Sequence, residues 1–108
     1  ILGLKPQGLP QAAYASSKAG LIGLTRDLAA QWTGRKNIRV NALAPGFFPS
    51  EMSDELPKDM VNMIKMFTPA GRLGDPEELA ATLIWLVSDA SSYVTGITVP
   101  VDGGLVMP

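Results

Sequence analysis

The sequence predicts an α/β fold, namely part of a doubly wound parallel sheet that is incomplete by itself. Segments with helical periodicity alternate with short β-branched segments, in the order helix, strand, irregular segment, helix, strand. Helices that alternate with strands in this way are the crossovers of a parallel sheet. Because two strands are too few for such a sheet, we expect the chain to be the tail of a larger α/β domain.

A long helix is predicted over residues 12–32, after a strand end and a glycine- and proline-rich loop at residues 1–11. Apolar residues recur in it at helical intervals and predict a core-facing stripe of Leu21, Leu24, Leu28 and Trp32. Its first half is rich in small residues and contains Gly20 and Gly23, each of which costs about 1 kcal/mol relative to alanine in a helix. Close approach of another backbone or of a ligand is one explanation for these glycines. The other is that the helix simply tolerates glycine at both positions.

The first strand is predicted over residues 38–43, after a polar turn at residues 33–37. The sequence Ala44-Pro45-Gly46 ends this strand, because proline and glycine interrupt regular structure.

The segment that follows is irregular at first and is then predicted to form a short helix from about Lys58. Four apolar residues share one face of this helix: Met60, Met63, Ile64 and Phe67. Four of the five methionines lie between Met52 and Met66. Methionine is flexible and adapts to irregular apolar surfaces, so the segment suits an apolar lid over a substrate. Ordinary core packing is the alternative, and we favour the lid.

Residues 75–88 carry the clearest helix-start signal in the chain. Asp75 is a good N-cap, Pro76 suits the first turn, and Glu78 completes a capping-box pattern. The inner stripe of this helix is predicted to be Leu79, Leu83 and Leu86.

The second strand is predicted over residues 93–101. Pro100 places it at a sheet edge, because proline cannot donate a hydrogen bond to a neighbouring strand. For Asp102-Gly103-Gly104 we favour a simple chain reversal.

Composition excludes several classes of function. The chain has 108 residues, with nine basic and ten acidic side chains, so it carries no electrostatic signature of nucleic-acid or anionic-membrane binding. It contains no cysteine and no histidine, which excludes disulfides, thiolate chemistry, a Ser-His-Asp triad and His-ligated zinc. No apolar run reaches the roughly 20 residues of a membrane span, and Ile1 does not begin a signal peptide. We expect a cytoplasmic protein.

The most informative stretch is Tyr14-Ala15-Ser16-Ser17-Lys18. In a helix, Tyr14 and Lys18 lie one turn apart on the same face. A tyrosine that acts as acid or base near neutrality needs its pKa lowered by roughly three units, which corresponds to about 4 kcal/mol. A positive charge about 5 Å away supplies roughly 3 kcal/mol at an effective dielectric of 20. Lys18 therefore supplies most of the shift, although a Tyr–Lys pair at this spacing also arises by chance.

With these segments placed, the chain resembles the short-chain dehydrogenase/reductase family along its whole length. Tyr14-Ala15-Ser16-Ser17-Lys18-Ala19-Gly20 resembles that family's Tyr-x-x-x-Lys helix, and residues 38–46 resemble its strand into a Pro-Gly cofactor loop. Residues 71–78 and 95–104 resemble its closing helix and edge strand. Each motif alone is weak, but four in the same order at suitable spacing are highly specific.

The resemblance implies a Rossmann-type sheet and hydride transfer between NAD or NADP and an alcohol or ketone. Tyr14 is then the general acid or base, and Lys18 lowers the pKa of its phenol. Both residues also bind the cofactor, and Lys18 does so at the nicotinamide ribose. Pro45 and Gly46 match the loop along the nicotinamide, at the carboxyl end of a strand where ligands bind in such sheets. Glycine there leaves room for the cofactor.

The same resemblance implies that Phe48 and Ser50 hold the nicotinamide carboxamide, through backbone and hydroxyl contacts. The family usually has threonine where Ser50 stands, a mild departure that keeps the hydroxyl. Pro45-Gly46 also has a purely structural interpretation as a turn.

Other family features are missing from these 108 residues. No glycine-rich phosphate loop is present, and the family's catalytic serine falls at or before Ile1. The family's asparagine, on an earlier helix, is also missing. We therefore expect residues 1–108 to be the C-terminal portion of a single domain, without its glycine-rich N-terminal half. The chain alone is expected to be inactive.

The expected partners of the whole protein are a small-molecule substrate and copies of itself in a dimer or tetramer, with neither nucleic acid nor membrane. The substrate is left open between a 3-oxoacyl thioester and a sugar or polyol, and the methionine-rich segment favours an apolar one. The alternative function is a non-catalytic oligomerisation or docking module. The Tyr14–Lys18 pair argues against it, because docking does not need a phenol beside an ammonium group.

Overall fold

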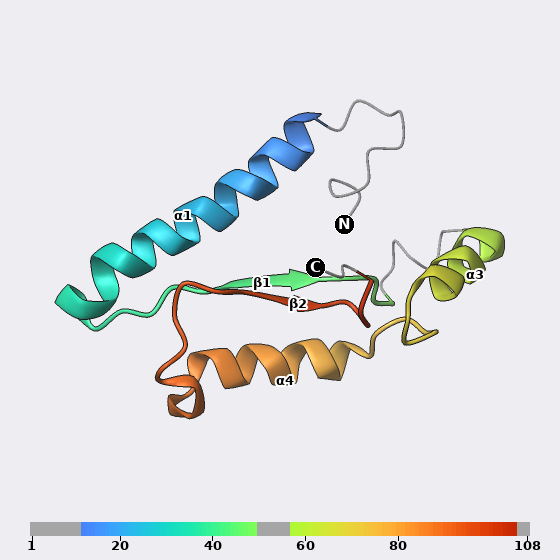
Figure 1. The fold of residues 1–108 in the computed structure, drawn as a ribbon. Coiled ribbons are helices and arrows are strands. Elements are labelled where there is room, and N and C mark those ends of the chain that lie inside the picture. Colours follow the sequence, from blue (N-terminus) through green and yellow to red (C-terminus); the bar gives the residue numbers. More distant parts are fainter. Residues whose placement is uncertain (1–11, 50–56, 106–108) are drawn as a thin grey trace.

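The computed structural model describes residues 12–49 and 57–105, and of residues 12–15 the backbone alone. Figure 1 shows the elements along the chain. They are α1 (Ala12–Lys36), β1 (Ala42–Pro45), α3 (Lys58–Phe67), α4 (Pro76–Val87), the short 3₁₀ helix η2 (Asp89–Ser91) and β2 (Thr98–Val101). The predicted order of helices and strands is confirmed.

The two strands form a parallel pair. Ala42 lies opposite Thr98 and Pro45 lies opposite Val101, so both strands end at the same level. The pairing extends beyond the strands on both sides, because Ala42 N–H donates to Ile97 O at 2.9 Å and Gly46 N–H donates to Val101 O at 2.8 Å.

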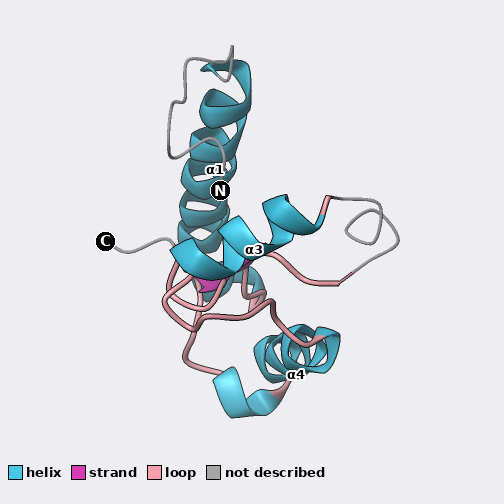
Figure 2. Cartoon of the chain, turned by 90° about the vertical axis from the view of Figure 1, so that its right-hand side faces the viewer, coloured by secondary structure: helices cyan, strands magenta, loops and turns pink. Residues whose placement is uncertain are grey.

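The helices cover both faces of this pair. In Figure 1, α1 lies on one side of the strands and α4 on the other, and the rotated view in Figure 2 shows the same arrangement. Helices on both faces of a parallel sheet define the doubly wound arrangement, which confirms the predicted fold class.

Helix α1 is longer than predicted. It continues through the expected polar turn to Lys36, and Asn37 ends it with a positive φ of 56°. Asn37 N–H donates to Thr33 O at 3.1 Å, as is common where a residue in the left-handed region follows a helix. Arg35 and Lys36 in the last turn also suit the negative end of the helix dipole.

The packing face of α1 also differs from the prediction. The residues it buries are Thr25 and Ala29, whereas Leu21 and Leu24 are 49% and 52% exposed. Ala29 lies against Gly96, where an added Cβ would be 3.3 Å from the alanine methyl group. Small side chains therefore set this contact. Leu28 and Trp32 of the predicted stripe are partly buried, so the prediction is wrong for Leu21 and Leu24 alone within the described chain.

Arg39 joins the extended segment before β1 to the end of α4. Its Nη1 donates to Ser91 O at 2.8 Å and to Val94 O at 3.0 Å. Its Nη2 donates to Leu86 O at 2.9 Å and to Ser88 O at 3.1 Å. The last carbonyls of a helix lack partners within the helix, and here the guanidinium of Arg39 and the hydroxyl of Ser91 donate to them.

Side-chain hydrogen bonds of this kind explain why both strands begin later than predicted. Residues 38–41 are extended but lie outside β1, and Asn41 binds Val94 O and Ile97 N–H through its amide at 3.0 and 3.2 Å. The segment before β2 consists of η2 and a turn. Side-chain hydrogen bonds therefore join these two segments together with one backbone bond, from Gly96 N–H to Val40 O at 2.7 Å.

The remaining helices begin where the sequence predicts. Helix α3 starts at Lys58, and α4 has the predicted capping box with Asp75 as N-cap and Glu78 at its third position. Of the predicted inner stripe of α4, Leu86 is buried, whereas Leu83 is half exposed. No residue of α3 is buried within the described chain.

Candidate functional site

Three turns converge at the carboxyl ends of β1 and β2. They are the loop at residues 46–49 after β1, the turn at residues 71–75 before α4, and the turn at residues 102–104 after β2. A cavity of about 90 Å³ lies among them. Its lining comes from all three turns and the end of α3: Phe47, Phe48, Thr68, Ala70, Arg72, Leu73, Gly74, Glu78, Val101, Asp102 and Gly103. Ligands of doubly wound sheets bind outside the carboxyl ends of the strands, so this is the candidate site.

The 46–49 loop is held against the end of β2. A Cβ added to Gly46 would lie 2.7 Å from both Cα and Cβ of Asp102, so no other residue fits there without a shift of backbone. The close approach of Asp102 is thus a reason for glycine that the sequence did not reveal. Close approach of a cofactor to Gly46 remains a prediction.

The 102–104 turn is a chain reversal, as expected. Gly103 and Gly104 have φ values of 65° and 89°, in the region that glycine adopts readily. Gly104 N–H donates to Asp102 Oδ1 at 3.0 Å. Gly103 O accepts from Ala70 N–H at 3.0 Å, which ties this turn to the segment after α3.

Phe48 has backbone groups that are available to a ligand. Among residues 12–49 and 57–105, neither its N–H nor its C=O makes a hydrogen bond. A carboxamide has one donor group and one acceptor oxygen, which match a free C=O and a free N–H. The role of Phe48 in holding a nicotinamide carboxamide, which the family resemblance implies, remains a prediction.

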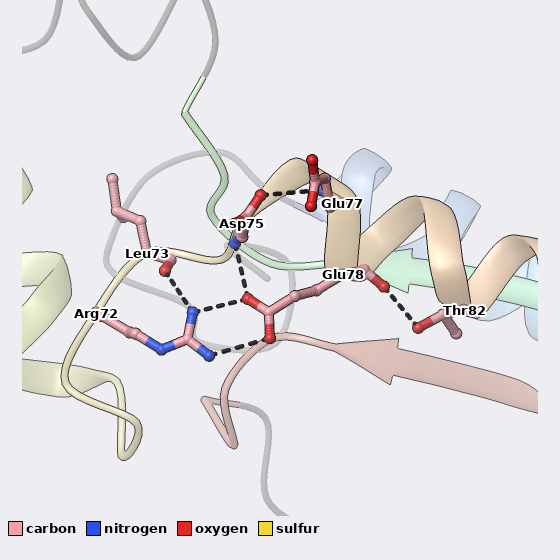
Figure 3. Close-up of polar contacts among 6 residues, drawn as sticks. All are labelled: Arg72, Leu73, Asp75, Glu77, Glu78 and Thr82. Atoms are coloured by element: carbon pink, nitrogen blue, oxygen red, sulfur yellow. Dashed lines mark hydrogen bonds and ion pairs between the residues drawn. The ribbon is translucent and has the colours of Figure 1, made fainter.

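The 71–75 turn is fixed to the start of α4 by a bidentate ion pair (Figure 3). Nη1 and Nη2 of Arg72 donate to Oε1 and Oε2 of Glu78 at 2.7 and 3.0 Å, and Arg72 Nη1 also donates to Leu73 O at 3.2 Å. Glu78 Oε1 accepts from Asp75 N–H at 2.9 Å in the capping box. The sequence predicted the capping box but not the partner of its glutamate.

This arrangement shifts the pKa values of both charged groups. The hydrogen bonds from Arg72 and from the Asp75 N–H lower the pKa of Glu78 from 4.5 to about 2, and the carboxylate in turn raises the pKa of Arg72. Both side chains are about half exposed, so water screens the ion pair and its contribution to the free energy of unfolding is small. Its main effect is to fix the conformation of the 71–75 turn.

A pH dependence follows from the lowered pKa of Glu78. The ionised form is favoured in the folded state, so its contribution is present above pH 4.5 and is lost as the pH falls from 4.5 towards 2. We expect Glu78→Gln to lower the melting temperature at pH 7, and this difference from wild type to vanish near pH 2. Glu77→Gln is the matched control, and its difference should not change over that range. A pH-independent effect of Glu78→Gln would contradict the assignment.

The structure describes only some of the predicted site residues. Figure 1 shows the first turns of α1, which carry Tyr14 and Lys18, at the end of the molecule towards which the strands run. Lys18 is exposed there. The side chain of Tyr14 and all of Ser50 lie outside the described residues, so their roles remain predictions. Pro45 is the last residue of β1 and is exposed next to Gly46.

Two further classes of site find no support in the described ranges. None of the helices there is long and apolar enough to cross a bilayer. No group of three or more acidic, histidine or cysteine side chains in the same ranges is arranged to hold a metal ion.

Comparison with known proteins shows which family this chain resembles. Residues 6–106 match a family model described as enoyl-(acyl carrier protein) reductase. The chain is 50% identical over 97 residues to the 3-oxoacyl-(acyl-carrier-protein) reductase FabG of Thermotoga maritima, which covers 90% of the chain and 39% of the relative. It is 46% identical over 97 residues to human (3R)-3-hydroxyacyl-CoA dehydrogenase, with coverages of 90% and 37%.

A solved structure is similar as well. The structure of the Pseudomonas aeruginosa RhlG/NADP active-site complex matches with a TM-score of 0.81 and 40% sequence identity, over 95% of this chain and 42% of that one. The chain thus spans about two fifths of the length of the relatives it matches.

Proposed function

This chain belongs to the short-chain dehydrogenase/reductase family, and on that premise we propose that the whole protein is an NAD- or NADP-dependent oxidoreductase. It transfers a hydride between the nicotinamide and an alcohol or ketone, in the cytoplasm. Residues 1–108 are the C-terminal portion of its single domain, and the glycine-rich half that binds the adenine side precedes them.

One observation carries this proposal: half of the aligned residues are identical to those of a named 3-oxoacyl-(acyl-carrier-protein) reductase over nearly the whole chain. A second relative, at 46% identity, is named for the reverse chemistry on a 3-hydroxyacyl thioester. Both names specify an acyl chain with oxygen at its third carbon. We therefore favour a 3-oxoacyl thioester over the sugar or polyol that the sequence left open.

In this reaction Tyr14 is the general acid. When bound, the reduced nicotinamide supplies a hydride to the carbonyl carbon of the substrate. The phenol of Tyr14 donates its proton to the carbonyl oxygen, which yields the alcohol, and in the reverse direction the tyrosinate accepts that proton. The cation of Lys18, four residues further along α1, stabilises the tyrosinate and hydrogen-bonds the ribose.

The 46–49 loop orients the nicotinamide in this proposal. Pro45 and Gly46 lie along the ring. The N–H and C=O of Phe48, which make no hydrogen bond to the described residues, bind the carboxamide. Ser50 adds a hydroxyl contact. Helix α3, with Met63 55% and Met66 83% exposed, is the apolar lid over the acyl chain, and Figure 1 shows it at the same end of the molecule.

Turnover by the whole protein tests the function. We expect NADH or NADPH to be oxidised, as measured by nicotinamide absorbance, when a 3-oxoacyl thioester is added. Oxidation with a ketose and not with the thioester would assign a sugar substrate instead. No oxidation with either class of ketone would contradict the proposal.

The 108-residue chain alone separates this function from a docking module. We expect no saturable binding of NAD(H) or NADP(H) in a fluorescence titration, because the phosphate-binding loop is missing from the sequence. Saturable binding by this chain would contradict that expectation. Poor solubility is also expected, since large apolar residues of α4 such as Ile84 and Val87 are 65% and 73% exposed. In the whole protein we propose that such faces are covered by the rest of the domain and by a dimer or tetramer.

A further inference from the structure

The 71–75 turn packs directly on the loop that carries Phe47 and Phe48. Gly74 N–H donates to Phe47 O at 2.9 Å, which joins the two backbones. The aromatic ring of Phe48 lies over Gly74, and a Cβ added to Gly74 would be 2.7 Å from Cδ1 and from Cζ of that ring. Real Cβ atoms do not come that close to other heavy atoms, so the ring takes the space of a side chain at position 74.

Space, and not backbone conformation, requires glycine at this position. Gly71 in the same turn has a φ of 74°, which other residues rarely adopt, but nothing lies within 4 Å of an added Cβ there. Gly74 differs from Gly71 in both respects. Its φ is one that other residues adopt, but the ring of Phe48 occupies the space of its missing side chain. Alanine at position 74 is therefore compatible with the backbone but has to displace the ring of Phe48.

The 71–75 turn is fixed in place by hydrogen bonds to the first turn of α4. Glu78 in the first turn of α4 binds Arg72 through both carboxylate oxygens and Asp75 through its N–H (Figure 3). Arg72 also binds the carbonyl of Leu73, next to Gly74. An added methyl group at position 74 therefore displaces the ring of Phe48, and the backbone bond from Gly74 N–H to Phe47 O passes the shift to the 46–49 loop.

We propose that Gly74 is a positioning residue for the nicotinamide half of the cofactor site. The space left by its missing side chain seats the ring of Phe48, and this sets the place of the backbone groups of Phe48. Gly74 itself touches neither cofactor nor substrate. The inference rests on the proposed function, because it assumes that the 46–49 loop binds nicotinamide.

Binding measurements on the whole protein test this inference. We expect Gly74→Ala to weaken the binding of NADH or NADPH about tenfold, because a displaced loop loses its contacts to the ring. Binding of ADP-ribose or its 2′-phosphate, which lack nicotinamide, should stay within about twofold of wild type. The matched control is Gly34→Ala in α1, where nothing lies within 4 Å of the added Cβ, and it should change neither affinity.

A second substitution checks the role of the ring. Phe48→Ala removes it and keeps the backbone groups of Phe48, so Gly74→Ala should have no further effect on NADH or NADPH binding in that background. If Gly74→Ala fails to fold, Arg72→Met loosens the same turn without adding atoms next to Phe48. It should weaken dinucleotide binding about threefold and leave ADP-ribose binding unchanged.

Three outcomes overturn the inference. Unchanged dinucleotide binding by Gly74→Ala would show that the loop accommodates a methyl group. Equal loss of dinucleotide and ADP-ribose binding would show a general loss of structure. An additive effect of Gly74→Ala in the Phe48→Ala background would exclude the ring as the link. If the wild-type protein binds neither NADH nor NADPH, the proposed function is wrong and the inference falls with it.

Discussion

Replacing Tyr14 with phenylalanine in the whole protein is expected to lower kcat by about 100- to 10,000-fold. The substitution removes the only group of the proposed site that donates a proton to the carbonyl oxygen, while the aromatic ring remains. Affinity for NADH or NADPH should change little, because the 46–49 loop and the adenine side of the site are unaltered. Steady-state turnover and a fluorescence titration measure the two quantities separately.

The chain offers a matched control for this experiment. Tyr93 is the other tyrosine in the sequence, and its side chain is fully exposed at the turn after η2. Tyr93→Phe removes the same hydroxyl group far from the proposed chemistry and should leave kcat within about twofold of wild type. Near-normal turnover by Tyr14→Phe would reject the assigned mechanism.

The largest effect on stability is expected at Arg39. Its guanidinium donates to carbonyl oxygens of α4, η2 and the turn that follows, and hydrogen bonds from charged groups are strong. Arg39→Met removes these charged hydrogen bonds, although each of the four oxygens keeps another donor within the described residues. We expect a cost of about 3 kcal/mol in the free energy of unfolding. If the whole protein has the length of its relatives, of which 97 residues are 39%, this lowers the melting temperature by roughly 6–12 °C.

Arg26→Met is the comparison for Arg39→Met. Arg26 is an exposed arginine on α1, so its replacement by the same residue should shift the melting temperature by less than about 2 °C. Similar shifts for the two variants would show that the contacts of Arg39 contribute no special stability.

Local signals in the sequence predicted helix starts well and strand starts poorly. The start of α4 depends on Asp75, Pro76 and Glu78, which interact within one turn, and the structure confirms all three. The starts of β1 and β2 depend on Arg39 and Asn41, whose partners lie about 50 residues away. Side-chain hydrogen bonds over that distance leave no periodic pattern in the sequence.

The prediction that Leu21 and Leu24 lie on the packing face of α1 was wrong for a related reason. Hydrophobicity favoured the leucines, but contact with Gly96 demands a small residue, and Ala29 meets that demand. The sequence could not reveal this, because the contact joins segments far apart in the chain.

In the candidate site, too, some features could be predicted from the sequence and others could not. Family resemblance directed attention to Pro45, Gly46 and Phe48. Of these, Phe48 lines the cavity at the carboxyl ends of the strands, whereas Pro45 and Gly46 do not. The support from Gly74 and from the Arg72–Glu78 pair could not be predicted, since it depends on how a turn folds back onto a distant loop.

Helix α4 is tethered at both ends by arginines from outside it. Arg72 binds its first turn through Glu78, and Arg39 binds the carbonyls of Leu86 and Ser88 at its end. Helices normally fray from their termini, where hydrogen-bonding groups exchange with water. Because guanidinium groups bind both termini of α4, we expect neither terminus to fray. Its amide protons should therefore exchange together, in a single opening event that also releases the segments on either side.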